Sequence, residues 1–150
     1  MAELWFYHLE KSELEQALPP LLEKSLARGW RALVRGTVEE RIATLDDALW
    51  TYKEESFLPH ARDGQGAEPS RQPIWLTTGQ GNPNGAQALF LVDGAAPGDL
   101  AAFERACLLF DGRDENALAA ARTHWKHAKA AGVTASYWQE KARGKWEKQQ

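Results

Sequence analysis

Short apolar runs alternate with longer amphipathic segments along this chain. Each run is bounded by polar or turn-forming residues, and such runs are typical of buried strands. The runs are LWFYHL (4–9), ALV (32–34), PIWLTT (73–78), ALFLVD (88–93), ACLLFD (106–111) and VTASYWQ (133–139). The pattern therefore predicts six strands.

The first segment between these runs repeats its leucines at helical spacing. It follows Ser12-x-x-Glu15, a pattern typical of a capping box. Pro19-Pro20 inside it predicts either a kink or a fresh start of the helix, because proline cannot donate to the preceding turn. The helical leucines are Leu14, Leu18, Leu21, Leu22 and Leu26.

Two further segments have helical periodicity. One covers about 38–50 and follows Thr37-x-x-Glu40, which resembles a second capping box. The other begins after Asp114, a good N-cap residue, and ends at about residue 131, where a glycine follows. The sequence thus predicts three main helices.

Alternation of strands and helices predicts an α/β fold. Helices are expected on both faces of a largely parallel sheet, in a three-layer α/β/α sandwich. A chain of 150 residues is long enough for a sizeable core and is expected to form one domain, residues 1–150. Within it, about 140–150 is expected to be a polar C-terminal tail.

A glycine-rich loop, GQGNPNG (79–85), raises the question of a phosphate site. A dinucleotide-binding loop opens a helix, whereas here a strand follows. Asn84-Gly85 is also a common turn dipeptide. We therefore expect a tight connection between two strands and no nucleotide-binding loop.

Candidate catalytic and metal-binding residues are few. Cys107, the single cysteine, lies in an apolar run and is expected to be a buried, unreactive thiol. His124 and His127 are three residues apart on a predicted helix, but no carboxylate or cysteine completes a ligand set, and Lys126 and Lys129 would repel a cation. The sequence predicts no catalytic site, no metal and no cofactor.

The net charge of −3 argues against general nucleic-acid binding, but the charge is unevenly distributed. Residues 113–150 hold 8 Lys/Arg and 4 Asp/Glu, a net +4, whereas residues 1–112 hold 10 and 17, a net −7. This asymmetry predicts a local anionic partner. No signal peptide and no membrane-spanning run is recognisable, so a cytoplasmic location is expected.

The predicted last helix carries cations on one stripe. Arg122, Trp125, Lys126 and Lys129 lie at i, i+3, i+4 and i+7. An indole beside three cations suits a peptide with an aromatic end group and carboxylates. A solvated basic face with a tryptophan at its edge is the simpler interpretation of the same spacing.

The run LDDALWTYKEESFLPH (45–60) resembles the L-D-x-x-L-W-x-x-x-x-x-S-F-[LV]-P-H signature of the chi subunit family of bacterial DNA polymerase III. WFYHL, GWRALV, PIWLTT, NPNGAQALFLVDG and WKHAKAAG…YW agree with that family in order and spacing. The similarity spans nearly the whole chain. It implies a Rossmann-like three-layer domain without a nucleotide site.

The resemblance also implies a function. Members of the family bind the acidic, phenylalanine-ended C-terminal tail of single-stranded DNA-binding protein and link it to the clamp-loader complex, usually through a second small subunit, psi. Their tail pocket lies on the last helix at an R-x-x-[YW]-K pattern, here Arg122 to Lys126. Arg122 and Lys126 would pair with tail carboxylates and Trp125 would pack the terminal ring. Lys129 would add a further cation.

Two interpretations remain open for the aromatic part of 45–60. Trp50, Phe57 and Leu58 either close the core at the sheet edge or belong to a docking surface for psi or another partner, since clustered loop aromatics often mark such a surface. Neither interpretation gives this stretch a chemical role.

Two functions are therefore considered. The first is a non-catalytic accessory subunit of the DNA polymerase III holoenzyme, a DNA-directed DNA polymerase, which reaches DNA only through the single-stranded DNA-binding protein. The second is a small-molecule or nucleotide-binding α/β domain of unknown activity. The cation stripe favours the first, and the lack of a phosphate-loop motif counts against the second.

Overall fold

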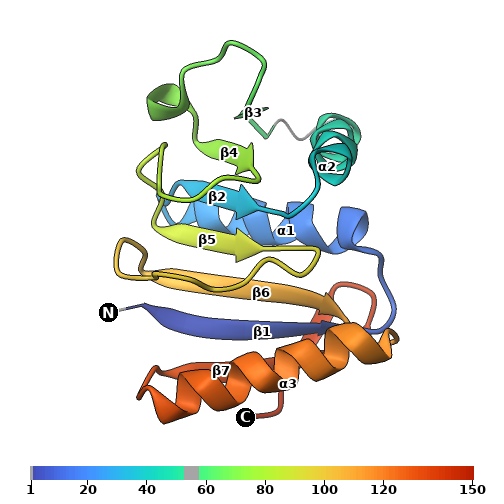
Figure 1. Ribbon diagram of the computed structural model, residues 1–150. Helices are drawn as coiled ribbons and strands as arrows, with labels where there is room; N and C mark the ends of the chain where they lie inside the picture. The colour runs from blue at the N-terminus through green and yellow to red at the C-terminus, as the bar shows by residue number, and fades with distance from the viewer. Residues whose placement is uncertain (1, 53–57) are drawn as a thin grey trace.

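Eight strands form one sheet in the part of the chain that the computed structural model describes, residues 2–52 and 58–150 (Figure 1). Their spatial order is β3-β4-β2-β5-β6-β1-β7-β8. The first seven in this order are parallel to one another, and β8 is antiparallel to β7. The strands are β1 (Glu3–Leu9), β2 (Ala32–Arg35), β3 (His60–Arg62), β4 (Ile74–Thr77), β5 (Ala88–Leu91), β6 (Arg105–Asp111), β7 (Ala135–Ala142) and β8 (Lys145–Lys148).

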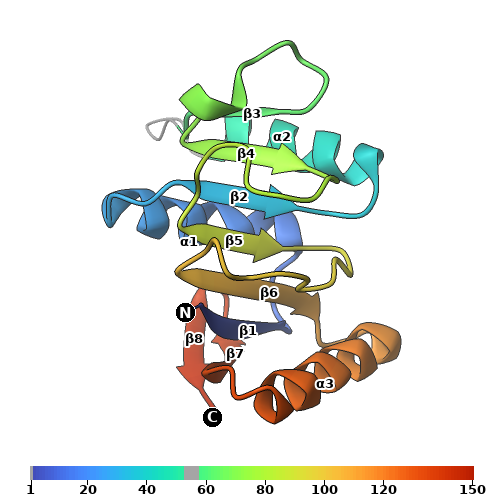
Figure 2. The same ribbon diagram turned by 60° about the vertical axis from the view of Figure 1, so that its left-hand side comes forward.

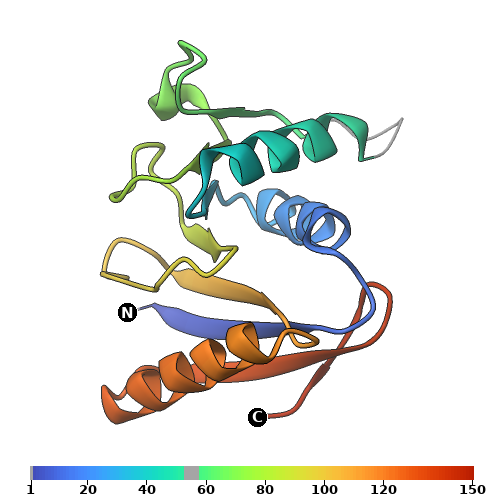
Figure 3. The same ribbon diagram turned by 45° about the vertical axis from the view of Figure 1, so that its right-hand side comes forward.

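Helices cover both faces of the sheet (Figure 3). α1 (Leu14–Ala27) and α2 (Glu39–Thr51) contact each other on one face, here called the α1 face. α3 (Glu115–Ala130) packs on β6 and β7 on the opposite side, the α3 face. A 3-10 turn, Pro69–Arg71, precedes β4. The predicted α/β sandwich with a mostly parallel sheet is confirmed. No helix in the described residues is long and apolar enough to cross a membrane.

Alternation along the strands divides their side chains between two cores. On β1, Phe6 enters the core of the α3 face, whereas Trp5 and Tyr7 face α1. The helical part of the α1-face core consists of Leu18, Leu21, Leu22, Ile42, Leu45 and Leu49. From α3, the small residues Ala121 and Ala128 are buried, so this helix can approach the sheet closely.

The N-cap of α3 is confirmed, whereas the predicted capping box of α1 is wrong. The Asp114 carboxylate accepts hydrogen bonds from two N–H groups in the first turn of α3. In α1 the N-cap is Glu13, and its N–H donates to the side chain of Gln16. Ser12 is not the cap, because its hydroxyl donates to the carboxylate of Glu140 on β7.

The second predicted capping box is also wrong. The hydroxyl of Thr37 donates to the carbonyl of Asp93, and Val38 takes the N-cap position of α2. Within α1, the pair Pro19-Pro20 does not start a new helix, since α1 is one element from its first to its last residue. At Ser12 and at Thr37, a tertiary contact overrides the local capping pattern.

The apolar pattern does not predict two of the strands. β3 lies at one edge of the sheet and falls outside the six predicted runs. β8 lies at the other edge, where a polar tail was expected (Figure 2). It pairs with β7 and brings Trp146 against the α1-face core. Both strands are short and mostly polar, so their periodicity is weak.

Candidate functional site

The predicted cation stripe lies on the solvent side of α3. Arg122, Lys126 and Lys129 are exposed, and Trp125 is half-buried. The indole packs edge-to-face on Phe6 of β1, with ring centroids 5.3 Å apart. The Lys129 ammonium lies 5.4 Å from the centroid of the same indole. The helix therefore holds this ring between the core and the cations.

A second aromatic ring, from β7, lies beside Trp125. Tyr137 meets the indole edge-to-face at 5.9 Å, and its hydroxyl is 2.7 Å from Nδ1 of His8. Burial lowers the pKa of His8, Glu10 opposes this shift, and the positive charge of Arg122 adds to it. Arg122 therefore lies near enough to the ends of β1 and β7 to influence charges there.

His8 and Tyr137 are neighbours of the stripe that sequence reasoning missed. Alternation along VTASYWQ places Tyr137 on the opposite face from Trp138, and this signal would have identified Tyr137 once α3 was assigned to its face. The position of the His8 ring also requires a glycine at residue 112. A Cβ at Gly112 would lie 1.8 Å from Nε2 of His8, so a larger residue would displace the ring. Such a long-range contact leaves no local pattern.

The cations of the stripe have no ion-pair partner among the described residues. Arg122, Lys126 and Lys129 form no pair with a carboxylate there, whereas Arg41 and Arg113 each have two. No stripe residue lines either of the two cavities described below. The stripe is thus an open surface whose charge is available to an external anion.

The turn between β1 and α1 gathers hydrogen-bond donors in the place where Rossmann-like folds bind phosphate. The N–H groups of Glu10, Lys11 and Ser12 donate to Oε1 of Glu140 at 2.7–3.1 Å, and the Ser12 hydroxyl donates to Oε2 at 2.6 Å. Burial raises the pKa of the Glu140 carboxyl, but these hydrogen bonds outweigh it and bring the pKa to about 2. The protein's own carboxylate occupies this anion site.

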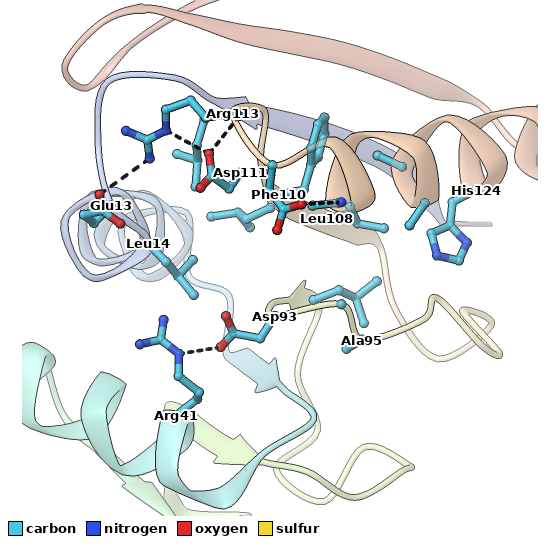
Figure 4. A pocket seen from close by; sticks show the side chains of 18 residues that line it. Glu13, Leu14, Arg41, Asp93, Ala95, Leu108, Phe110, Asp111, Arg113 and His124 are labelled. Atoms are coloured by element: carbon cyan, nitrogen blue, oxygen red, sulfur yellow. Dashed lines mark hydrogen bonds and ion pairs between the residues drawn. The ribbon is translucent and has the colours of Figure 1, made fainter.

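A cavity of about 420 Å³ opens at the carboxyl ends of β5, β6 and β1 (Figure 4). It lies where α1 and α3 leave adjacent strands on opposite faces, the position at which open α/β folds bind ligands. Arg41 contacts Glu15 at 2.6 Å and Asp93 at 3.2 Å, and Arg113 contacts Asp111 at 2.8 Å. Both arginines of the lining are therefore neutralised internally, and the nucleotide-binding interpretation gains no support from them.

The loop GQGNPNG (79–85) directs two backbone carbonyl groups toward the guanidinium of Arg35. Arg35 donates from Nε to the Gly79 carbonyl at 3.0 Å and from Nη2 to the Gly81 carbonyl at 2.7 Å. Asn84 is buried and donates to a backbone carbonyl of β2. The loop joins β4 and β5, parallel strands that flank β2, so it is a crossover and not the predicted tight connection. A phosphate cradle would instead present N–H groups.

The thiol of Cys107 is buried, as predicted, and burial raises its pKa to about 12. It therefore stays protonated at physiological pH. Burial lowers the pKa of His124, and the charge of His127 adds to this effect. Among the residues placed by the structure, no cluster of three or more His, Cys, Asp or Glu side chains could hold a metal ion.

Trp50 and Leu58, for which core closure and docking were both considered, have different surroundings in the structure. Leu58 is buried in the α1-face core, so its assignment to a docking surface is wrong. Trp50, near the end of α2, is 52% exposed and packs on the ring of His60 at 4.2 Å. His60 in turn lies 2.8 Å from Asp46, which ties β3 to α2. Phe57 lies outside the described residues.

Comparison with known proteins identifies one family. A family model described as DNA polymerase III chi subunit, HolC, matches residues 1–136. A Rickettsia prowazekii (strain Madrid E) protein named probable DNA polymerase III subunit chi is 29% identical over 101 residues. This alignment covers 67% of the present chain and 59% of the relative, so the chain spans less than two thirds of the relative's length. The stripe on α3 falls inside the family match, and β8 falls beyond it.

Proposed function

Because the chain belongs to the DNA polymerase III chi subunit family, we propose that it is an accessory subunit of a bacterial DNA polymerase III holoenzyme. In this role, α3 binds the acidic C-terminal tail of single-stranded DNA-binding protein and so links coated template to the clamp-loader complex. The chain itself carries out no catalysis in this proposal. Replication takes place in the bacterial cytoplasm, which is therefore the compartment that the proposal requires.

The observation that carries this proposal is a half-buried indole on α3 that shares its stripe with exposed cations, none of which pairs with a carboxylate among the described residues. Arg122 and Lys126 lie one turn apart and can each pair with a different carboxylate of an extended acidic peptide. The exposed part of Trp125 gives the terminal aromatic ring an apolar contact. Lys129, over the same indole, adds positive charge at the end of the stripe.

A docking role remains proposed for Trp50. Its exposed ring sits on the far side of the sheet from the stripe, on α2, so one partner can bind there while a tail is bound on α3. Psi or the clamp loader itself is the partner that this arrangement suits. Replacing Trp50 should weaken that contact and leave tail binding unchanged.

Fluorescence polarisation with a labelled peptide that copies the tail of the native single-stranded DNA-binding protein tests the proposal. We expect saturable binding that weakens with salt, because charge pairing dominates an exposed site. Arg122→Ala and Lys126→Ala should each lower the affinity on the order of tenfold, as expected for a lost charged hydrogen bond.

Matched controls are Arg71→Ala and Lys11→Ala, which remove one arginine and one lysine from exposed positions away from α3. They should bind the peptide as the parent protein does. If the folded parent protein does not bind the peptide, or if the controls lose as much affinity as the α3 variants, the assignment of the stripe is wrong.

A further inference from the structure

A groove of about 480 Å³ on the α1 face gathers the aromatic residues that the proposed function leaves unused. It lies between the C-terminal half of α1 and the strands β6, β1, β7 and β8, on the other side of the sheet from the stripe. We call it the tryptophan groove. Its aromatic and charged lining consists of Trp5, Tyr7, Phe90, Trp138, Trp146, Lys24, Arg28 and Arg105.

Aromatic rings and guanidinium groups form a stacked series that starts in this groove and continues to Trp30 beside it. The Trp138 ring stacks on Trp5, with centroids 5.2 Å apart and planes inclined by 22°. The guanidinium of Arg105 lies 3.7 Å from the centroid of Trp5 and 5.2 Å from that of Trp30. Arg28 continues the series at 4.2 Å from the Trp30 centroid. Flat groups are therefore already layered here at stacking distances.

The charge of the groove is positive and uncompensated. Among the residues that the structure describes, Lys24, Arg28 and Arg105 line it, and no Asp or Glu does. Across the described part of the chain, none of these three cations forms an ion pair. Nε of Arg105 is buried and has no hydrogen-bond partner. A buried cationic donor without an acceptor is costly, and an anion entering the groove would satisfy it.

The number of tryptophans in the tryptophan groove favours one of two kinds of anionic ligand, an acidic peptide or unpaired nucleic acid. An acidic peptide with one aromatic residue would cover a single ring, whereas Trp5, Trp138 and Trp146 all border the groove and each is half-buried. Unpaired nucleic acid offers a series of flat bases together with regularly spaced phosphates, which suits tryptophan faces flanked by arginine and lysine. We infer that the tryptophan groove binds single-stranded DNA directly.

This inference goes beyond the proposed function and does not depend on the tail. It also departs from the expectation that the protein reaches DNA only through a partner protein. That expectation rested on the net charge of the whole chain, −3, whereas the groove itself is lined by cations. Trp138 and Trp146 lie beyond residue 136, where the family match ends. With three cations the site is weak, and a tail bound on α3 would raise the local concentration of the strand around it.

Quenching of the intrinsic tryptophan fluorescence by an oligothymidylate of about ten nucleotides tests the inference. An abasic strand with the same number of phosphates and an acidic peptide of equal charge are run beside it. We expect saturable quenching by the oligothymidylate, with a slope of log K against log salt of about −2 for three neutralised phosphates. The abasic strand and the peptide should bind markedly less well.

The double variant Lys24→Gln/Arg28→Gln removes two exposed cations and leaves the strands of the groove intact. It should weaken oligothymidylate binding on the order of tenfold. The matched control Lys11→Gln/Arg71→Gln should bind as the parent does, and so should Arg122→Ala, which separates this site from the tail site. Equal binding of the abasic strand, a preference for the acidic peptide, or equal weakening in the control would each overturn the inference.

Discussion

The β1–α1 turn and the stripe on α3 both attract negative charge, yet the fold treats them in opposite ways. At the turn, three N–H groups and the Ser12 hydroxyl converge on the Glu140 carboxylate, which the protein supplies itself. On α3, the cations around Trp125 have no internal partner within the described residues. Donors and cations therefore indicate a binding site only where the fold leaves them unsatisfied.

The same difference explains why, in the described part of the chain, the two positions at which Rossmann-like folds usually bind ligands offer no free donors or cations to a phosphate. The usual phosphate position at the first turn is occupied, and the arginines at the switch-point cavity are paired. The charge on the outer surface of α3, in contrast, stays exposed. Such a surface suits an extended peptide better than a compact ligand.

The largest expected effect is at the turn. Glu140→Gln removes a buried carboxylate that accepts hydrogen bonds from five donors, the fifth being the N–H of Gly144. Because these bonds lower the carboxyl pKa from 4.5 to about 2, the variant should lose roughly 3 kcal/mol of unfolding free energy at neutral pH. Denaturant unfolding measures this. Glu147→Gln, at an exposed position on β8, is the matched control and should change stability little. Equal losses in both variants would show that the turn contributes nothing special.

Measuring the unfolding free energy as a function of pH tests the contribution of Glu140 in a second way. The folded-state pKa of Glu140 lies below its unfolded value, so its stabilising contribution is complete above about pH 5 and is lost as the pH falls toward 2. The parent protein should therefore lose on the order of 3 kcal/mol more than Glu140→Gln over this interval. Parallel pH profiles for the two proteins would contradict the proposed network.

A smaller effect, on binding instead of stability, is expected at the stripe. Arg122→Glu should weaken tail binding more than tenfold, because it replaces attraction by repulsion. It should change the unfolding free energy by less than about 0.5 kcal/mol, since the side chain is exposed. Polarisation and denaturant unfolding on the same preparation check both parts. A large loss of stability would show that Arg122 has a structural role.

The smallest effect is expected at Lys129. Its ammonium rests on the Trp125 ring and lies at the end of the stripe. Lys129→Ala should therefore weaken tail binding by only about two- to threefold, as for a cation–π contact and an exposed charge. A loss as large as that of Arg122→Ala would place the main carboxylate contact at this end of the helix.

Local pattern is sufficient for the parts of this fold that local interactions decide. The apolar runs of β1 and β6 and the Asp114 cap of α3 follow from periodicity and capping chemistry. The spacing of the stripe puts Trp125 beside Lys129, whose ammonium lies 5.4 Å from the indole centroid. These features need no information from distant residues.

Features that depend on long-range contacts are missed. Ser12 has the right spacing for an N-cap, but its hydroxyl is taken by Glu140, 128 residues away. The hairpin that brings Trp146 against Tyr7 is formed by a polar segment with no clear alternation. The tryptophan groove likewise arises because β1, β6 and β7, far apart in sequence, are adjacent in the sheet.

The most direct test of the central claim is to follow the backbone amides by NMR while the tail peptide is added. The claim predicts that the largest shifts occur on α3 between Arg122 and Lys129 and at Tyr137 beside it, while the amides of Glu10, Lys11 and Ser12 do not move. Large shifts at the β1–α1 turn, with α3 unaffected, would contradict it, because they would mean that the peptide displaces Glu140 and binds at the turn.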